Sequence, residues 1–327
     1  MKRGVLPSIA LASAALITVP IAVADAFDTT GAGGPTSSLT IIVPGSAGGG
    51  YDSLAREAQQ SLRANGISGN VQVVNVPGAS GTVGLQSLVE MSGSDDTVLV
   101  VGSAMVGGIE VTETEYSFDD VTAITSATTD YPVLVLPESS PYATTEEFIE
   151  AWRQDPEGHA IGGGALGNSD HLSVLAVAEA VGIDPADVNY IAYSGGGEVL
   201  GSLLSGTVAA GVSGYGEISD QLDARTVRGI GITAPEPIDG IDMPTFVEQG
   251  IDVVTPNWRG FVAPPGLTPE EEAGLEDIFE EMFTTQEWAD ALARNQWEDQ
   301  VLTGTELEQF IADQVQDTQG LLTEIGS

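Results

Sequence analysis

The chain contains no cysteine and only two histidines among its 327 residues. Without cysteine, neither a disulfide nor a lipid-attachment thiol is available. The lack of thiolates and the scarcity of imidazoles argue against a zinc site, which is built mainly from such ligands. No EF-hand spacing occurs either. We therefore expect no metal and no other cofactor.

Lysine occurs once, at position 2, and 48 acidic residues face 9 basic ones, for a formal charge of −39. A surface of this sign repels nucleic acid and anionic membranes, so neither is expected as a partner. An acidic, lysine-poor surface is also typical of halophilic adaptation, because high salt screens the self-repulsion. An anionic ligand must therefore find strong local positive potential in its binding site.

Long apolar runs are absent except at the N-terminus. Two basic residues precede an apolar stretch from Val5 to Val23, and a small-residue cleavage pattern ends at Ala26. We interpret residues 1–26 as a secretory signal peptide; an uncleaved membrane anchor is the alternative. No other stretch reaches the roughly 18 apolar residues that a membrane span needs. The mature protein is expected in the periplasm or otherwise outside the cytoplasm.

The mature chain of about 300 residues exceeds what one compact core usually holds, so we expect two domains. A polar, glycine-rich leader comes first, at residues 27–38. Buried-type strands and helices then alternate, which predicts doubly wound α/β sheets. The expected strands cover residues 39–43, 71–76, 97–101, 133–136, 159–162, 188–193, 208–212 and 228–232. The expected helices cover residues 51–64, 81–90, 170–181 and 198–205, with capping signatures opening four more near Thr144, Thr268, Thr284 and Thr305.

Two glycine loops, far apart in the sequence, each connect a strand to a helix. They read IIVPGSAGGGYD at residues 41–52 and AIGGGALGNSDH at residues 160–171. Such a loop aims free backbone N–H groups at one point, and the helix that follows adds the positive end of its dipole. Two of them in two halves of an exported protein indicate a clamp for a carboxylate. A tight turn without a ligand is the alternative.

Familiar phosphate and catalytic motifs do not fit these loops. A P-loop needs Gly-Lys-Ser/Thr where this chain has Tyr51, Asp52 and Ser53, and the glycine spacing does not match a dinucleotide fingerprint. The consecutive Ser169, Asp170 and His171 are no catalytic triad, since neighbours on a helix point apart. Asn168 or Ser169 fits an N-cap. His171 could donate to a carboxylate or serve a structural role, and Asp52 suits a first-turn helix acid.

Two further glycine turns follow strands and precede helices, PGASGT at residues 77–82 and YSGGGE at 193–198. Open α/β sheets bind ligands at this edge. Ser103, just after an expected strand, falls at the same edge. Trp258 and Arg259 lie in an expected return crossing at residues 258–266, where they could wall a cleft; Arg259 could equally be a surface hinge residue.

Taken in order, these pieces resemble the substrate-binding proteins of tripartite tricarboxylate transporters. They read VPGSAGGGYDSLAR at residues 43–56, VPGASGTVG at 76–84, DHL at 170–172, YSGGG at 193–197 and WRGFVAP at 258–264. The resemblance covers nearly the whole mature chain. One departure is that the family's tyrosine-lysine-glycine run reads Tyr193-Ser194 here, with Glu198 after the glycines. This loss of a cation indicates salt adaptation, or a ligand that carries less negative charge or an amine.

The resemblance implies an α/β, two-lobed, periplasmic-binding-protein-like (type II) fold. Each lobe would be a mostly parallel sheet flanked by helices, and crossing strands would join the lobes. We place lobe 1 at residues 39–139 and 257–327, and lobe 2 at 140–256. Together with the turns above, the loops at 46–52 and 167–171 give the candidate ligand-binding residues Ser46, Ala47, Gly48, Gly49, Tyr51, Asp52, Gly78, Ser103, Gly167, Asn168, Ser169, His171, Gly195 and Trp258.

The implied function is capture of a small organic carboxylate between two closing lobes, followed by delivery to a membrane permease of one large and one small subunit. We expect a monomer without enzymatic activity. An extracytoplasmic sensor subunit, presenting the bound acid to a signalling receptor, is one alternative. A secreted hydrolase or isomerase is another, although GVSGY at residues 211–215 does not complete the G-x-S-x-G nucleophile motif.

Overall fold

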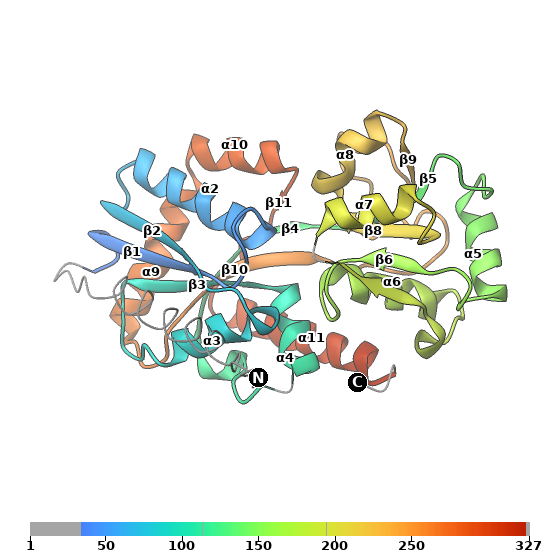
Figure 1. Cartoon of the computed structure of the whole chain (residues 1–327). Coiled ribbons are helices and arrows are strands. Elements are labelled where there is room, and N and C mark those ends of the chain that lie inside the picture. Colours follow the sequence, from blue (N-terminus) through green and yellow to red (C-terminus); the bar gives the residue numbers. More distant parts are fainter. Residues whose placement is uncertain (1–33, 113, 194, 325–327) are drawn as a thin grey trace, which may run out of the picture.

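The computed structural model describes residues 34–112, 114–193 and 195–324. Two α/β lobes lie side by side and are joined by strands that run between them (Figure 1). This confirms the predicted fold class. The expected signal peptide and residues 27–33 of the leader lie outside the described residues. Within the described ranges, no helix is long and apolar enough to cross a membrane.

The first lobe is built on a six-stranded sheet with the order β11-β4-β10-β3-β1-β2. Its strands are β1 (Ser38–Val43), β2 (Asn70–Asn75), β3 (Thr97–Gly102), β4 (Thr122–Asp130), β10 (Asn257–Ala263) and β11 (Glu298–Asp299). Its α-helices are α2 (Gly50–Ala64), α3 (Thr82–Val89), α4 (Ser103–Thr112), α9 (Pro269–Phe283), α10 (Gln286–Asn295) and α11 (Gly304–Glu324), with short 3-10 turns η1 (Ala79–Gly81) and η2 (Phe118–Asp120).

The second lobe is built on a five-stranded sheet with the order β7-β6-β8-β5-β9. Its strands are β5 (Pro132–Pro137), β6 (Ile161–Gly163), β7 (Tyr190–Ala192), β8 (Ala210–Gly214) and β9 (Val227–Ile232). Its helices are α5 (Thr145–Gln154), α6 (Ser169–Ala180), α7 (Gly196–Leu204) and α8 (Tyr215–Asp223), with the 3-10 turn η3 (Pro185–Asp187).

Both sheets are mixed, not mostly parallel. Parallel pairing joins β1 to β2 and β3 in the first lobe, and β6 to β7 and β8 in the second. The connecting strands run the other way, because β10 is antiparallel to β3 and β4, and β5 is antiparallel to β8 and β9. Each parallel half thus carries the βα units, and each antiparallel half carries the crossing.

The chain leaves the first sheet one element earlier than the boundary expected after residue 139. Strand β4 ends at Asp130, and β5 begins at Pro132 in the other sheet, so only Tyr131 separates them. Strand β4 was not among the predicted strands, because threonine and serine dominate its sequence. These hydroxyls are nevertheless buried: Ser126 Oγ donates to the carbonyl of Gln300 and accepts from the Leu302 N–H. The strand is stabilised by polar contacts that its composition does not reveal.

Apolar side chains cover both faces of each sheet. In the first lobe, α2, α9 and α10 bury Leu54, Phe279 and Trp288 against one face, and Phe261 stacks on Phe279 with ring centroids 4.3 Å apart. Burying one such side chain stabilises the fold by about 1.5–3 kcal/mol. Thr144 and Thr268 cap α5 and α9 as predicted. The other two predicted caps are wrong, because Thr285 and not Thr284 accepts the Trp288 N–H at the start of α10, and α11 begins at Gly304, before Thr305.

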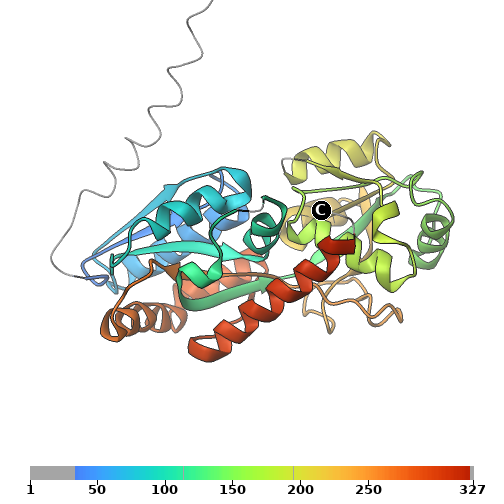
Figure 2. The same cartoon turned by 90° about the horizontal axis from the view of Figure 1, so that it is seen from below.

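Helix α11 runs along one side of the molecule and reaches from the first lobe to the second (Figure 2). It packs against α4 and β4, and Leu307 and Ile311 join the first-lobe core. At its other end, Leu321 and Leu322 pack with Leu172 of α6. The lobes are therefore connected by a packed helix as well as by crossing strands.

A close backbone contact also joins the lobes. A Cβ atom added to Gly107 of α4 would lie only 1.7 Å from the carbonyl oxygen of Gly167 in the second lobe. No side chain fits there, so glycine at 107 permits the approach. Gly167 itself has φ +80°, a left-handed conformation that favours glycine.

We predict that Gly107→Ala weakens this contact and lowers the free energy of unfolding by about 2 kcal/mol, because the added methyl group cannot be accommodated without a shift of the lobes. Chemical denaturation in molar salt measures the change. Gly274→Ala is the matched control, since Gly274 also lies within a helix and a Cβ added there would meet nothing within 4 Å. Equal stability of Gly107→Ala and the parent protein would show that the contact is absent in solution.

Candidate functional site

The candidate site is the cleft between the lobes. It consists of two adjoining cavities of about 550 and 790 Å³, each lined by residues of both lobes. They share the lining residues Gly48, Gly50, Tyr51, Ala104, Asn168, Asp170 and Glu217. A larger groove of about 1210 Å³ lies between α5 and β9, but it belongs to the second lobe alone. The cleft is the place where movement of the lobes would enclose a solute.

The first turns of α2, α4, α6, α7 and α8 all contribute to the lining of this cleft. Glycine occupies the N-cap position of three of these helices, Gly49 before α2, Gly195 before α7 and Gly214 before α8, and no side chain caps them. Uncapped first turns leave backbone N–H groups available and present the positive end of the helix dipole. The backbone at these helix starts favours an anion, whereas the carboxylates of Asp170 and Glu217, in the first turns of α6 and α8, oppose one on the second-lobe side.

The Asp52 carboxylate holds the first glycine loop in place. It is 2% exposed and accepts hydrogen bonds from Gly48 N (2.8 Å), Arg56 Nε (2.8 Å) and Asn75 Nδ2 (2.9 Å). Burial alone would raise the pKa of Asp52, but these three donors outweigh it and hold that pKa below its ordinary value. Asp52 thus shapes the loop from behind and does not line the cleft.

Tyr51 lies at the floor of the cleft, where its hydroxyl accepts the Met105 N–H at 3.1 Å. Burial raises the pKa of the Tyr51 phenol well above its ordinary value, so the ring stays neutral. Ser103 instead connects two elements through hydrogen bonds. Its Oγ donates to the Pro256 carbonyl (3.0 Å) and accepts the Trp258 N–H (3.1 Å), which ties the start of α4 to the crossing strand.

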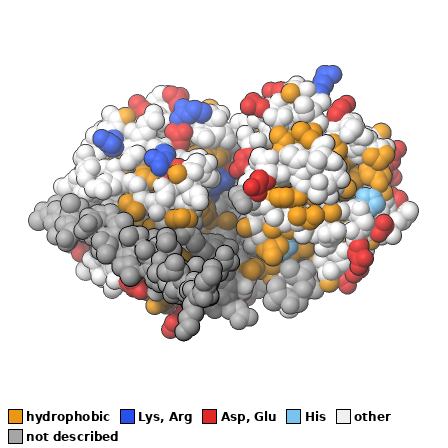
Figure 3. Space-filling model, viewed as in Figure 1, with side chains coloured by type: hydrophobic (Ala, Val, Ile, Leu, Met, Phe, Trp, Pro, Cys, Tyr) orange, Lys and Arg blue, Asp and Glu red, His pale blue; other side chains and the backbone are white. Residues whose placement is uncertain are grey.

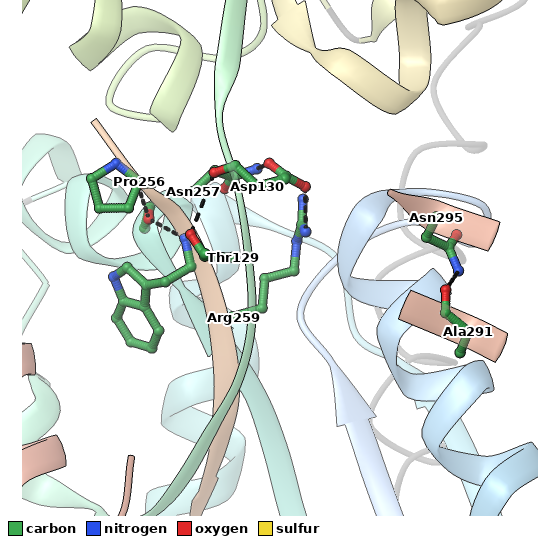
Figure 4. A network of polar contacts seen from close by, with 9 residues as sticks. Thr129, Asp130, Pro256, Asn257, Arg259, Ala291 and Asn295 are labelled. Atoms are coloured by element: carbon green, nitrogen blue, oxygen red, sulfur yellow. Dashed lines mark hydrogen bonds and ion pairs between the residues drawn. The ribbon is translucent and has the colours of Figure 1, made fainter. Parts of the chain in front are cut away.

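Trp258 and Arg259 point to opposite faces of β10, as successive strand residues must. The Trp258 ring is fully buried away from the cleft, 5.3 Å from the ring of Phe310. Arg259 lines the cleft instead, although it is only 8% exposed. Trp258 as a wall of the cleft is therefore wrong, and its neighbour takes that place (Figure 4).

The Arg259 guanidinium is the buried cation of the cleft. Its Nη1 donates to Asp130 Oδ2 at 2.7 Å, and Asn257 Nδ2 donates to the other carboxylate oxygen at 2.7 Å (Figure 4). Burial alone would lower the pKa of Arg259, but the Asp130 carboxylate outweighs it and raises that pKa. A Cβ on Gly50 would lie 3.0 Å from Arg259 Nη2. The guanidinium therefore stands directly beside the uncapped start of α2.

On the second lobe, His171 supports the loop from inside. Its Nδ1 accepts the Gly167 N–H at 3.1 Å, its own N–H donates to the N-cap oxygen of Asn168 at 3.0 Å, and its ring lies 4.6 Å from that of Tyr190. It is 4% exposed, and burial lowers the pKa of His171 to about 4. The imidazole is neutral at pH 7 and does not line the cleft.

Asp170, one position earlier, does line the cleft. Its Oδ2 accepts the Gly164 N–H at 2.9 Å. Burial, together with the charges of Glu217 and Asp130, raises the pKa of Asp170 to about 7 despite this hydrogen bond. No cation lies within ion-pair distance of its carboxylate among the described residues.

The structure separates the sequence candidates into two groups. Residues that line the cleft are Ser46, Ala47, Gly48, Gly49, Tyr51, Asn168, Ser169 and Gly195. Residues that do not line it are Asp52, Gly78, Ser103, Gly167, His171 and Trp258. Gly50, Asp130, Asp170 and Glu217 line the cleft but were not among the predicted ligand-binding residues. Helix α8 was not predicted, so Glu217 could not be placed, although a glycine turn at the end of an expected strand was a usable signal.

We predict that Asp170→Asn stabilises the protein more at pH 8 than at pH 5. The folded pKa of Asp170, about 7, lies above the ordinary value of 3.8, so the folded state holds a proton that the unfolded state has lost between these values. Wild-type stability from this group is therefore present at low pH and lost as the pH rises towards 7. Asparagine carries no charge, and the expected gain is on the order of 2 kcal/mol.

Chemical denaturation of both proteins at pH 5, 6, 7 and 8, without any added carboxylate, checks this prediction. The His171 contribution runs in the opposite direction, because its folded pKa is lowered, but it is common to both proteins and cancels in the difference. A stability difference that does not change with pH would contradict the raised pKa of Asp170.

Comparison with known proteins identifies the family. The family model of the tripartite tricarboxylate transporter family receptor matches residues 54–327. Protein BugT of Bordetella pertussis is 25% identical over 299 residues, which cover 90% of each chain. A crystal structure of a TctC solute binding protein from Polaromonas, without ligand, superposes with a TM-score of 0.73 at 25% identity and covers 89% of this chain and 99% of its own.

The same fold occurs in a Rhodopseudomonas palustris protein with adipate, at a TM-score of 0.76 and 20% identity, covering 89% of this chain and 98% of that one. The match to the family model begins after β1 and the first glycine loop, and it covers the remaining strands of both sheets and most of the residues that line the cleft. This chain belongs to the tripartite tricarboxylate transporter receptor family.

Proposed function

We propose that this protein is an extracytoplasmic receptor that captures a small organic carboxylate in the cleft between its lobes and delivers it to the permease subunits of a tripartite transporter. The observation that carries the proposal is the convergence of uncapped helix starts from both lobes on one cleft, beside the buried Arg259. The adipate in the R. palustris relative of the same fold supports a carboxylate ligand.

Local positive charge in the cleft offsets the repulsion of an anion by the acidic protein as a whole. With a formal charge of −39, the protein repels an anion at long range. Within the cleft, however, the ligand meets backbone N–H groups and the Arg259 guanidinium in a part-buried setting, where such interactions are stronger than at the surface. Hydrogen bonds from backbone groups also need no lysine, which agrees with the absence of lysine after residue 2.

Closure of the lobes provides the mechanism of capture. The second-lobe loop at residues 164–170 faces α2 and α4 of the first lobe across the cleft. A ligand that contacts both lobes stabilises the closed state relative to the open one. The crossing strands β4, β5 and β10 are the connections about which such a motion would occur. No nucleophile with a positioned base lines the cleft among the described residues, so we propose binding without catalysis.

Thermal unfolding tests the proposal directly. The protein without residues 1–26, in molar salt, is heated with mono-, di- and tricarboxylates, aromatic acids and amino acids. A ligand that binds only the folded state stabilises that state by about 2.7 kcal/mol at a hundredfold excess over its dissociation constant. A ligand that binds therefore raises the unfolding midpoint. If no acid shifts the midpoint of folded protein, the receptor proposal is wrong.

We predict that Gly50→Val abolishes the shift produced by the best acid. The new side chain would enter the cleft floor against Arg259, where even a Cβ comes within 3.0 Å of Nη2. Gly201→Val is the matched control, because nothing lies within 4 Å of its Cβ and α7 places it outside the cleft lining. Retention of the shift in Gly50→Val would place the ligand elsewhere.

A further inference from the structure

We propose that the solute is a carboxylate that also carries a cationic nitrogen, and that Glu217 and Asp170 of the second lobe hold this nitrogen. The inference rests on the proposed function and specifies the ligand class of the same cleft. It follows from the way charges are divided between the two walls.

The lining of the cavity beside Arg259 contains two cations and four carboxylates: Arg259, Arg294, Asp130, Asp170, Glu217 and Asp220. Both cations are already paired. Arg259 binds Asp130 at 2.7 Å, and the half-exposed Arg294 binds Glu57 at 2.6 Å. The remaining three carboxylates all belong to the second lobe, and none of them forms an ion pair within the described part of the chain. The second-lobe wall therefore carries uncompensated negative charge, to which Asp170 contributes fully only above its pKa of about 7.

Two of these carboxylates each have one oxygen without a protein hydrogen bond in the described structure. Glu217 Oε2 accepts from Ser213 Oγ at 2.9 Å, and Asp170 Oδ2 accepts from Gly164 N at 2.9 Å. Glu217 Oε1 and Asp170 Oδ1 make no such bond, and both residues line both cavities of the cleft. The bonded oxygens fix the carboxylates in position, and the other oxygens are left for a ligand.

Glu217 faces the first lobe as well as its own. Its charge contributes to the raised pKa values of Asp170 and of Arg259 across the cleft. A Cβ on Gly196 would lie 2.9 Å from Glu217 Oε2, so the carboxylate stands against the start of α7. Figure 3 shows the same division, with basic side chains on the first-lobe side of the hollow between the lobes and acidic ones on the second-lobe side.

A ligand with negative charge alone fits only one of these walls. One carboxylate can lie at the start of α2 beside Arg259, but a second one would approach Glu217 and Asp170 and be repelled. An ammonium group at the same place would form charge-assisted hydrogen bonds with the two free oxygens. An amino acid, or another amine-bearing acid, therefore complements both walls at once.

Matched pairs of probes that differ by one ammonium group test the inference. Isothermal titration calorimetry compares glutamate with glutarate, aspartate with succinate, and 4-aminobutyrate with butyrate. We expect the amine-bearing member of the best pair to bind at least about tenfold more tightly. Tighter binding of the member without nitrogen overturns this inference but supports the carboxylate receptor. Binding of none of the six by folded protein overturns this inference, and the receptor proposal is then decided by the wider thermal-unfolding panel.

Charge-removing variants locate the nitrogen. Glu217→Gln is expected to weaken binding of the preferred amine-bearing probe about tenfold. Binding of the partner acid without nitrogen should be unchanged or tighter. Asp223→Asn is the matched control, because it removes a charge from the same helix outside the cleft lining. It should change the affinity for neither probe. Thermal unfolding shows whether the Glu217→Gln protein is folded. If it is folded and the ratio of its affinities for the two probes is unchanged, Glu217 does not bind the nitrogen and the assignment is overturned.

Discussion

The ion pair between Arg259 and Asp130 is the interaction on which the arrangement of the cleft depends. Its two residues lie on β10 and at the end of β4, the neighbouring strands that lead to the second lobe. Loss of one partner would leave the other charge buried, which typically costs about 3–5 kcal/mol. Because Asn257 and the ring of Trp297 also contact the pair, the guanidinium has little freedom. The positive charge of the cleft is thus built into the connection between the lobes.

Several helix starts in the cleft differ from those outside it, although Asn168 caps α6 in the cleft and α3 outside it begins after the uncapped Gly81. Outside it, threonine hydroxyls cap α5, α9 and α10 at Thr144, Thr268 and Thr285. Inside it, glycine stands at the N-caps of α2, α7 and α8 and contributes no side-chain hydrogen bond. Glycine at an N-cap, in place of a capping side chain, costs only roughly a few tenths of a kcal/mol. In the cleft it leaves the N–H groups at these helix starts available to a ligand.

The sequence predicted the parallel halves of both sheets well, since runs of Val, Ile and Leu between glycine turns are typical of buried strands. It could not predict β4, whose four threonines and one serine lie between β10 and β11, with Ser126 hydrogen-bonded to residues 300 and 302. Helices α4 and α8 are short and interrupted by glycine, so their periodicity is weak, and with α8 the position of Glu217 was lost. Trp258 and Arg259 were correctly placed in the crossing strand. The sequence did not show which of the two side chains faces the cleft, because that depends on which face of the sheet the C-terminal helices cover.

Helix α11 has a consequence for affinity. Because it packs against α4 at one end and α6 at the other, it restrains how far the lobes can separate when the cleft is empty. A receptor whose binding-competent arrangement is rarely populated binds with an apparent affinity reduced by that population. A restraint that narrows the range of open states keeps this penalty small. Helix α11, which does not line the cleft, would thereby influence the concentration at which the receptor becomes occupied.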